Sequence, residues 1–172
     1  MIDFTKFEKY SKAGPRYTSY PTAPEFKESF GEKELIDKYR NGDKNRALSL
    51  YIHIPFCRSA CYFCGCNVVF TSKDDKKKRY IDYIEKELHL IAKYLDTNRT
   101  ITQMHFGGGT PTFLEPEDLD RVIKLVQKTF PNFAKDAEIS CEVDPRFFTV
   151  EHMSVLKNGG TNRLSFGVQD LD

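Results

Sequence analysis

Along this chain of 172 residues, short β-type segments alternate with helical segments from Leu48 onward. The β-type segments are residues 48–56, 101–106, 137–143 and 162–169. Strands that alternate with helices predict an α/β fold, with a parallel sheet and right-handed crossovers. This class of fold restricts where a site can lie, because ligand sites in parallel sheets assemble at the carboxyl ends of the strands.

Helical patterns fill the three intervals between these strands. Apolar residues recur at spacings of three and four over residues 81–95, which is typical of an amphipathic helix. We expect a second helix to begin at Pro116, and a third to be capped by Thr149 and ended by the pair that starts at Gly159. One more helix, residues 32–40, is predicted in an otherwise irregular N-terminal part.

The predicted strands have one apolar side and one polar side, whereas a parallel sheet covered on both faces reads as continuous apolar runs. The apolar positions are Leu50, Ile52, Ile54, Met104, Phe106, Ile139, Cys141, Val143, Leu164, Phe166 and Val168. The polar positions are Ser49, Tyr51, His53, Gln103, His105, Ser140, Glu142, Arg163, Ser165 and Gln169. A polar face costs stability unless it is hydrated or lines a ligand site. We therefore predict a barrel or half-barrel with a polar ligand in its lumen, and cover by another polar domain is the alternative.

The predicted barrel is incomplete within this sequence. Four strands are too few to close a barrel, for which about eight are typical. We divide the chain into an N-terminal extension, residues 1–47, and a truncated barrel domain, residues 48–172.

Composition excludes several classes of partner. The formal net charge is +1, so no strong field attracts nucleic acid or a membrane surface. The N-terminus lacks the apolar region of a secretory signal, and no apolar run approaches the ~20 residues that span a bilayer. Five cysteines without an export signal indicate a reducing compartment. We expect a cytoplasmic protein that binds neither nucleic acid nor membrane, and a monomer.

Four of the five cysteines lie between Cys57 and Cys66, with the spacing C-x3-C-x2-C-x-C. Structural zinc sites usually pair two C-x2-C knuckles across a long insert, and the second knuckle is absent here. A redox pair would use Cys61 and Cys64 but would leave Cys57 unexplained. A compact run of thiolates on one loop favours an iron–sulfur cluster. The spacing does not decide between three ligands, which leave one iron open for chemistry, and four, which make an electron carrier.

Further motifs follow the second and third predicted strands. The stretch GGGTP, residues 107–111, lacks Cβ atoms at three positions, so its backbone can approach a ligand closely; an ordinary tight turn is the alternative. It lacks the G-K-[ST] ending of a nucleotide P-loop. Glu142 lies at a polar position, and the alternative is a solvated strand end with Arg146 as its ion-pair partner. His53 and His105 also lie at polar positions and are equally explained as hydrogen-bonded lumen residues.

These motifs together resemble the radical S-adenosylmethionine (SAM) enzymes, and among them the family of oxygen-independent coproporphyrinogen III oxidases, also called coproporphyrinogen dehydrogenases. The stretches that carry the resemblance are RYTSYPTA, LYIHIPFC, CYFCGCN, HFGGGTP, EISCEVDPR and NRLSFGVQD. The stretches RYTSYPTA and CGC favour this family over its haem chaperone-like and haem-degrading relatives. The resemblance implies a partial (β/α)6 barrel with additions at both ends.

The resemblance also implies the cofactors and their ligands. Cys57, Cys61 and Cys64 match the three ligands of a [4Fe–4S] cluster, and SAM binds the open iron through its amino and carboxylate groups. The cysteine that matches Cys66 is not expected to ligate. Further cofactor-binding positions are Tyr51, Phe63, Gly108, Gly109, Thr110, Glu142 and Gln169. The last of these is expected to touch a second SAM molecule, so the complete enzyme would bind two.

The implied reaction is the oxidative decarboxylation, without O2, of two propionates of coproporphyrinogen III to vinyl groups. The product would be protoporphyrinogen IX in haem biosynthesis, and the electron donor a flavodoxin or a ferredoxin. Because the sequence ends before the later barrel strands and the C-terminal domain of the family, we expect the chain to be an inactive fragment. Two alternatives stay open: an iron–sulfur or zinc electron-transfer or binding module, and a radical SAM haem chaperone-like protein.

Overall fold

The computed structural model describes residues 25–61, 64–71 and 74–167. Contacts within the chain divide it into two compact units, Met1–Leu35 and Ile36–Asp172. Helix α1 (Glu32–Asn41) carries acidic residues in its first turn and basic residues in its last, which complements the helix dipole. It confirms the helix predicted for residues 32–40. The predicted start of the barrel domain at Leu48 stays a prediction.

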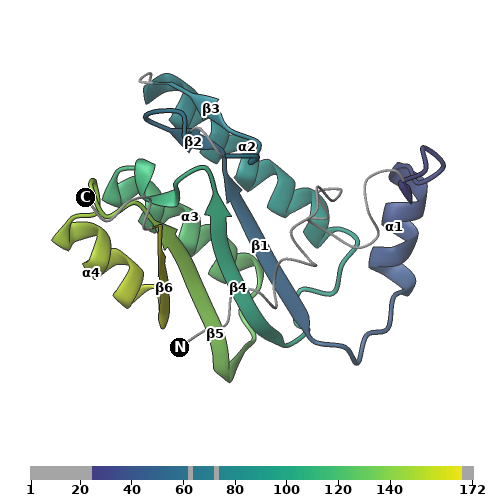
Figure 1. The fold of residues 1–172 in the computed structure, drawn as a ribbon. Helices are drawn as coiled ribbons and strands as arrows, with labels where there is room; N and C mark the ends of the chain where they lie inside the picture. The colour runs from purple at the N-terminus through teal and green to yellow at the C-terminus, as the bar shows by residue number, and fades with distance from the viewer. Residues whose placement is uncertain (1–24, 62–63, 72–73, 168–172) are drawn as a thin grey trace, which may run out of the picture. The chain divides into compact units, whose positions relative to one another are not determined.

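A four-stranded parallel sheet forms the centre of the second unit, with the strand order β1-β4-β5-β6. Its strands are β1 (Leu48–Ile54), β4 (Ile101–Gly108), β5 (Phe133–Val143) and β6 (Arg163–Phe166). Each new strand adds to the same edge, as Figure 1 shows. This order matches a barrel wall, because a doubly wound sheet reverses its order at a switch point. The predicted parallel α/β fold is confirmed.

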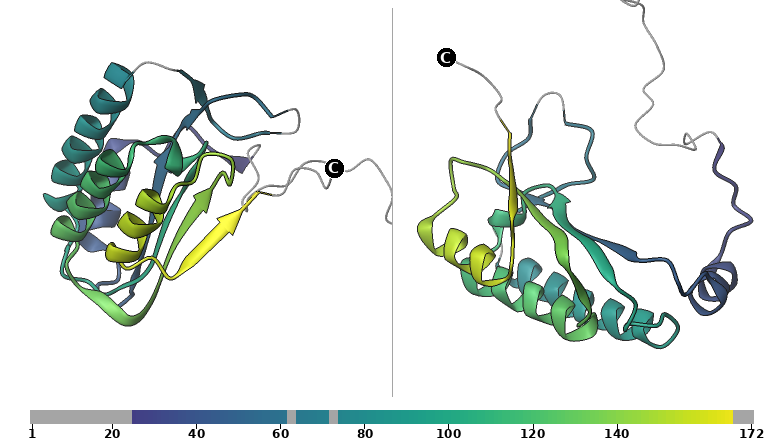
Figure 2. Two further views of the ribbon diagram at one scale, coloured as in Figure 1. Left: turned by 90° about the vertical axis from the view of Figure 1, so that its left-hand side faces the viewer. Right: turned by 90° about the horizontal axis from the view of Figure 1, so that it is seen from below.

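Three helices lie together on one face of this sheet (Figure 2). They are α2 (Asp74–Ala92), α3 (Pro116–Thr129) and α4 (Val150–Asn158). The strand residues that face them include fully buried Ile54, Met104, Phe106 and Cys141. The helices add Ile81, Leu119, Val122, Ile123, Val126 and Leu156 to the same core. The apolar side predicted from strand alternation is therefore the side that the helices cover.

Local signals set where these helices begin and end. Pro116 lies in the first turn of α3, followed by acidic residues, as predicted. Thr149 caps α4 in a reciprocal capping box, in which its side chain accepts from the backbone N–H of His152. The buried His152 ring also lies 2.9 Å, through Nε2, from the carbonyl oxygen of Leu114. This contact ties the start of α4 to the segment that follows the glycine loop.

Two strand ends differ from the prediction near the cysteines. Strand β1 ends at Ile54, and a separate two-residue strand β2 (Phe56–Cys57) pairs in parallel with β3 (Val69–Phe70). The backbone N–H of Val69 donates to the carbonyl oxygen of Pro55 at 2.6 Å, beside this pair. Pro55 thus separates the two strands, and both ends of the cysteine loop are fixed to each other.

The other strand boundaries also shift. Strand β4 continues to Gly108, because the first glycines of the GGGTP stretch still pair with His53 and Ile54 of β1. Strand β5 begins at Phe133, four residues before the predicted start at Ala137. Strand β6 ends at Phe166, and the remaining part of the predicted strand, with Val168 and Gln169, lies outside the described residues.

The polar positions of the strands lie on the face away from the three helices. Tyr51, Gln103 and Arg163 are exposed there, while Ser140 is buried among its neighbours. One apolar position departs from the pattern, since Phe166 is 52% exposed. It lies on β6, the edge strand of the sheet, where only one side is flanked by another strand. No helix of the described part is long and apolar enough to cross a bilayer.

Candidate cofactor site

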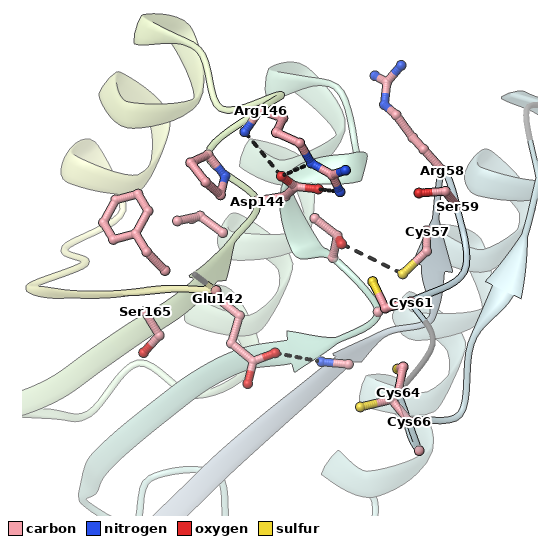
Figure 3. Close-up of a pocket in the computed structure, with 18 residues that line it drawn as sticks. Cys57, Arg58, Ser59, Cys61, Cys64, Cys66, Glu142, Asp144, Arg146 and Ser165 are labelled. Carbon is pink, nitrogen blue, oxygen red and sulfur yellow. Dashed lines mark hydrogen bonds and ion pairs between the residues drawn. The ribbon is translucent and has the colours of Figure 1, made fainter. Parts of the chain in front are cut away.

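A cavity of about 900 Å³ opens at the carboxyl ends of the four sheet strands (Figure 3). Its walls come from the cysteine loop after β1, the glycine loop after β4, the end of β5 and the end of β6. Each motif that the sequence places at a strand end contributes to it. The predicted convergence of these motifs on one edge of the sheet is therefore confirmed for the described residues.

Cys57 is the anchored cysteine of the loop. It is half-buried at the end of β2, and its Sγ lies 3.7 Å from the hydroxyl of Thr110. The backbone N–H of Thr110 donates to the carbonyl oxygen of Phe56 at 2.9 Å. Burial raises the pKa of the Cys57 thiol, the hydrogen bond with Thr110 lowers it, and the nearby Cys64 and Cys61 raise it further. A bound metal would reverse this balance, because metals bind the thiolate.

The other three cysteines of the loop are exposed and line the same cavity. The backbone N–H of Cys64 donates to the carbonyl oxygen of Cys61 at 3.1 Å, which gives the loop a turn. A hydrogen bond with Cys64 and then burial raise the pKa of the Cys66 thiol. Figure 3 shows Cys57 and Cys61 beside the glycine loop, with Cys64 and Cys66 farther along the wall. Phe63, predicted to contact SAM, lies outside the described residues.

The cysteine loop supplies thiolates, the ligand type that an iron–sulfur cluster takes. Within the described ranges, no group of three or more His, Cys, Asp and Glu side chains could hold one ion. A structural zinc site needs four ligands around one ion. In an iron–sulfur cluster each thiolate binds a different iron, so the ligands surround a larger body. All four cysteines of the loop line the cavity, so thiol donors for such a cluster are present on its wall.

The glycine loop approaches the cysteine segment closely, which gives its glycines a packing role that the sequence did not predict. Gly108 has φ +122°, and a Cβ there would lie 2.9 Å from the His53 ring and from the Ile54 carbonyl oxygen. A Cβ on Gly109 would lie 2.7 Å from the Phe56 carbonyl oxygen and 2.9 Å from Cys57 Sγ. Real Cβ atoms do not come this close to backbone. The missing side chains therefore let two protein segments pack, and ligand approach is not needed to explain them.

Glu142 is held by two donors at the end of β5. One carboxylate oxygen accepts from the backbone N–H of Gly108 at 3.3 Å. The other lies 3.3 Å from Nε2 of His105, whose Nδ1 is 2.7 Å from the Ser140 hydroxyl. The sequence predicted a polar position for each residue but not this network. The available signal was strand register, because His105 pairs directly with Tyr51 on β1 and with Ser140 on β5.

Tyr51 and His53 lie on β1 next to the Glu142–His105 network and are not among the residues that line the cavity. The Tyr51 ring stacks on His105 with centroids 5.8 Å apart and planes 19° apart. The Tyr51 hydroxyl is 3.1 Å from Nδ1 of His53, and Nε2 of His53 is 2.9 Å from the carbonyl oxygen of Asn67. Burial raises the pKa of Tyr51, and the charges of Glu142 and Cys66 raise it further. Both ring nitrogens of His53 are occupied, which agrees with a hydrogen-bonded lumen residue.

Arg146 pairs with Asp144 and not with Glu142, so the ion pair considered in the sequence is wrong. Its guanidinium donates to the two Asp144 carboxylate oxygens at 2.9 and 2.7 Å, and its backbone N–H donates at 3.1 Å. These bonds lower the pKa of Asp144. Cys141 is fully buried in the core, as predicted, and burial raises its pKa to about 12. Gln169 lies outside the described residues.

A comparison with models of known protein families identifies the superfamily of this chain. A family model described as the Radical SAM superfamily matches residues 51–172. The chain belongs to the radical SAM superfamily. Proteins of this superfamily in general work with a [4Fe–4S] cluster and SAM. The residues of the cysteine loop and those that line the cavity all lie within the matched residues 51–172.

Individual proteins of similar sequence give a more specific comparison than the superfamily. The chain is 59% identical over 174 residues to a Helicobacter pylori protein (strain J99) named oxygen-independent coproporphyrinogen III oxidase, covering 99% of the chain and 38% of that relative. It is 46% identical over 170 residues to the Escherichia coli K12 protein of the same name, covering 99% of the chain and 36% of that relative. A Mannheimia haemolytica protein of that name is 46% identical over 143 residues, covering 83% of the chain and 96% of the relative.

A solved structure shows the same arrangement in three dimensions. Coproporphyrinogen III oxidase from Escherichia coli, described as a radical SAM enzyme, superposes with a TM-score of 0.83 at 46% identity. The superposition covers 91% of this chain and 35% of that chain. The chain thus spans little more than a third of the length of the first relatives that it matches.

Proposed function

We propose that the chain is part of a radical SAM enzyme that decarboxylates two propionates of coproporphyrinogen III, giving protoporphyrinogen IX in haem biosynthesis. One observation carries this proposal. Cys57, Cys61 and Cys64 line the same cavity as the glycine loop and Glu142, at the ligand-binding edge of a parallel sheet. An electron carrier needs the thiols but not the rest of the cavity.

In this proposal the three cysteines hold a [4Fe–4S] cluster and Cys66 does not ligate it. When bound, the cluster and SAM supply the one-electron chemistry that removes hydrogen from the substrate. Cys57 provides the fixed end of the ligand set, because β2 and Thr110 hold it in place. With three cysteine ligands, one iron of the cluster would have no ligand from the protein and would be available to SAM.

The remaining proposed contacts surround SAM. Glu142 lines the cavity from β5, and Gly108, Gly109 and Thr110 line it from the glycine loop. Tyr51 lies next to this wall on β1, where its ring stacks on His105, the partner of Glu142. The resemblance adds Phe63 and Gln169, the second of these for a second SAM molecule. A carboxylate and backbone groups suit the polar donors and acceptors of SAM. Two SAM molecules in the complete enzyme remain part of the proposal.

The substrate and partners of the complete protein follow from the names of the relatives and from the family resemblance. The substrate would be coproporphyrinogen III, and a flavodoxin or ferredoxin would supply electrons. We propose a cytoplasmic monomer that binds neither nucleic acid nor membrane. The formal charge of +1 supports the absence of a nucleic-acid partner.

Anaerobic reconstitution of the chain with iron and sulfide tests the proposal. We expect about four irons per chain, as in a [4Fe–4S] cluster, and a reduced-state electron paramagnetic resonance signal that changes when SAM is added. Cys57→Ser, Cys61→Ser and Cys64→Ser should each remove most of the iron. The matched controls Cys66→Ser and Cys141→Ser should keep it.

Two results would contradict the proposal. A colourless protein that takes up zinc alone would support a zinc-binding module. A cluster that requires Cys66 as well as the other three thiols, and whose signal ignores SAM, would support an electron-transfer module. The iron content and the spectrum together separate these outcomes.

A further inference from the structure

A row of side chains in one register crosses the polar face of the sheet, and its middle residue, His105, also contacts Glu142. Tyr51, His105 and Ser140 occupy the same register on β1, β4 and β5. The His105 side chain is one-third exposed and reaches two partners, the Ser140 hydroxyl at 2.7 Å and the Glu142 carboxylate at 3.3 Å. His105 has no role in the proposed function.

The partners of His105 fix which ring nitrogen carries the proton. An ionised carboxylate only accepts hydrogen bonds, so the contact with Glu142 requires a proton on Nε2. Nδ1 of the neutral ring is then an acceptor, and the Ser140 hydroxyl donates to it. Ser140 is buried, so water does not compete freely for this hydroxyl. The carboxylate thus selects the tautomer with the proton on Nε2, and the Ser140 hydroxyl, which can donate or accept, adapts to it by donating to Nδ1.

Glu142 is held at both oxygens but remains accessible. Its Oε2 accepts from the Gly108 N–H and its Oε1 accepts from His105, yet the side chain is 46% exposed and lines the cavity. A carboxylate oxygen can accept more than one hydrogen bond. The two fixed donors therefore restrain the carboxylate while leaving acceptor sites free toward the cavity.

We propose that His105 is a positioning residue, which holds the Glu142 carboxylate in the orientation that accepts hydrogen bonds from the nucleoside part of SAM. This inference rests on the proposed function. The nucleoside part of SAM offers donors to a carboxylate, namely the ribose hydroxyls and the adenine amino group. Without His105, Glu142 would have to be ordered when the ligand binds, and that ordering weakens affinity.

A matched pair of substitutions separates the two ends of the imidazole. The side-chain amide of His105→Gln reaches the position of Nε2 and can still donate to Glu142. The shorter His105→Asn reaches only the position of Nδ1 and keeps the contact with Ser140. Both partners lie on β5, so each variant keeps one contact between β4 and β5. Positioning of Glu142 favours the Gln variant, whereas a role limited to the Ser140 contact would favour the Asn variant.

The experiment measures binding of SAM, and separately of methionine, to the reconstituted chain and its variants by calorimetry. Methionine carries the amino-acid end without the nucleoside. We expect His105→Asn to weaken SAM binding by about threefold to tenfold, the effect of ordering one long side chain. His105→Gln should stay within about twofold of the unchanged chain. Methionine affinity should be the same in all of them.

Several outcomes overturn the inference. Equal SAM affinity in the Asn variant and the unchanged chain would show that His105 positions nothing. Equal weakening toward SAM and methionine would show that His105 does not act through the nucleoside. Should His105→Asn not fold, Ser140→Ala is the second variant, and unchanged SAM affinity there would count against the tautomer argument. Failure of the unchanged, reconstituted chain to bind SAM would instead reject the proposed function itself.

Discussion

The two sides of the sheet's carboxyl end are stabilised in different ways. Beneath the strands, Met104, Phe106 and Cys141 are fully buried against α2, α3 and α4. Around the cavity, three of the four loop cysteines are exposed, and the walls are joined by a small number of hydrogen bonds. Packing fixes the first region without any ligand, while the second has open positions that a ligand can fill.

The site residues accordingly fall into two groups, those that lie on strands and those that lie on the cysteine loop. Tyr51, His105 and Glu142 sit on strands whose other side is packed into the core, so their backbone positions are set by folding. Cys61 and Cys64 lie on a loop with exposed side chains. We infer that the strand residues form a prepared part of the site, and that binding of the cofactor completes the loop part.

The largest effect should come from the packed side. Met104→Ala removes a fully buried side chain of β4 and should lower the free energy of unfolding by about 2–5 kcal/mol. Its neighbour Gln103 is exposed on the other face, so Gln103→Ala should change stability by less than about 0.5 kcal/mol. Urea denaturation followed by circular dichroism measures both. Similar losses for the two variants would contradict the assignment of the faces.

An intermediate effect is expected where the glycine loop meets the cysteine strand. Gly109→Ala places a Cβ 2.7 Å from a backbone oxygen of Phe56, and the resulting overpacking should cost about 1–3 kcal/mol. The variant should also bind less iron, because the displaced neighbour carries Cys57. Gly65→Ala is the control, since a Cβ there meets no atom within 4 Å. If both variants behaved alike in stability and iron content, close packing of the loop would not explain Gly109.

The smallest effect should be at the ion pair on the cavity wall. Asp144→Asn should lower stability at neutral pH by roughly 0.2–1 kcal/mol, the range for pairs near the surface. Arg146 lowers the pKa of Asp144 below its ordinary value of 3.8. The stabilisation by this ion pair is therefore present above pH 3.8, and it is lost as the pH falls through the lowered pKa that Asp144 has in the folded chain. Urea midpoints should differ at pH 7 and converge in acid, and a constant difference would exclude the charge as its cause.

Much of the architecture was accessible from residue periodicity. Alternation identified which side of β1, β4 and β5 is packed, because a period of two distinguishes faces whenever one face is buried. Helix signals at Pro116 and Thr149 were also sufficient, since capping depends on neighbours in the chain. The convergence of the motifs followed from topology alone, because all parallel strands end at the same edge.

Features that depend on contacts between distant segments were not accessible in the same way. The pairing of β2 with β3 involves two residues on each side, too few to show periodicity. The sequence interpretation linked the glycines to ligand approach, whereas the contact of Gly109 with Cys57 arises only when the two segments pack in the folded chain. The partner of Arg146 was also misassigned, because a local turn brings it to Asp144. Site residues Phe63 and Gln169 stay predictions.

The β2–β3 pair has a consequence for how tightly the chain would capture iron. Pairing of Phe56–Cys57 with Val69–Phe70 joins the two ends of the segment that carries the thiols. Chemically, the segment resembles a macrocyclic chelator whose ring is closed by amide hydrogen bonds. A closed ring presents its donors at a higher effective concentration than an open chain. A substitution at Val69 or Phe70, which carry no ligand atom, would therefore weaken the binding of the whole cluster.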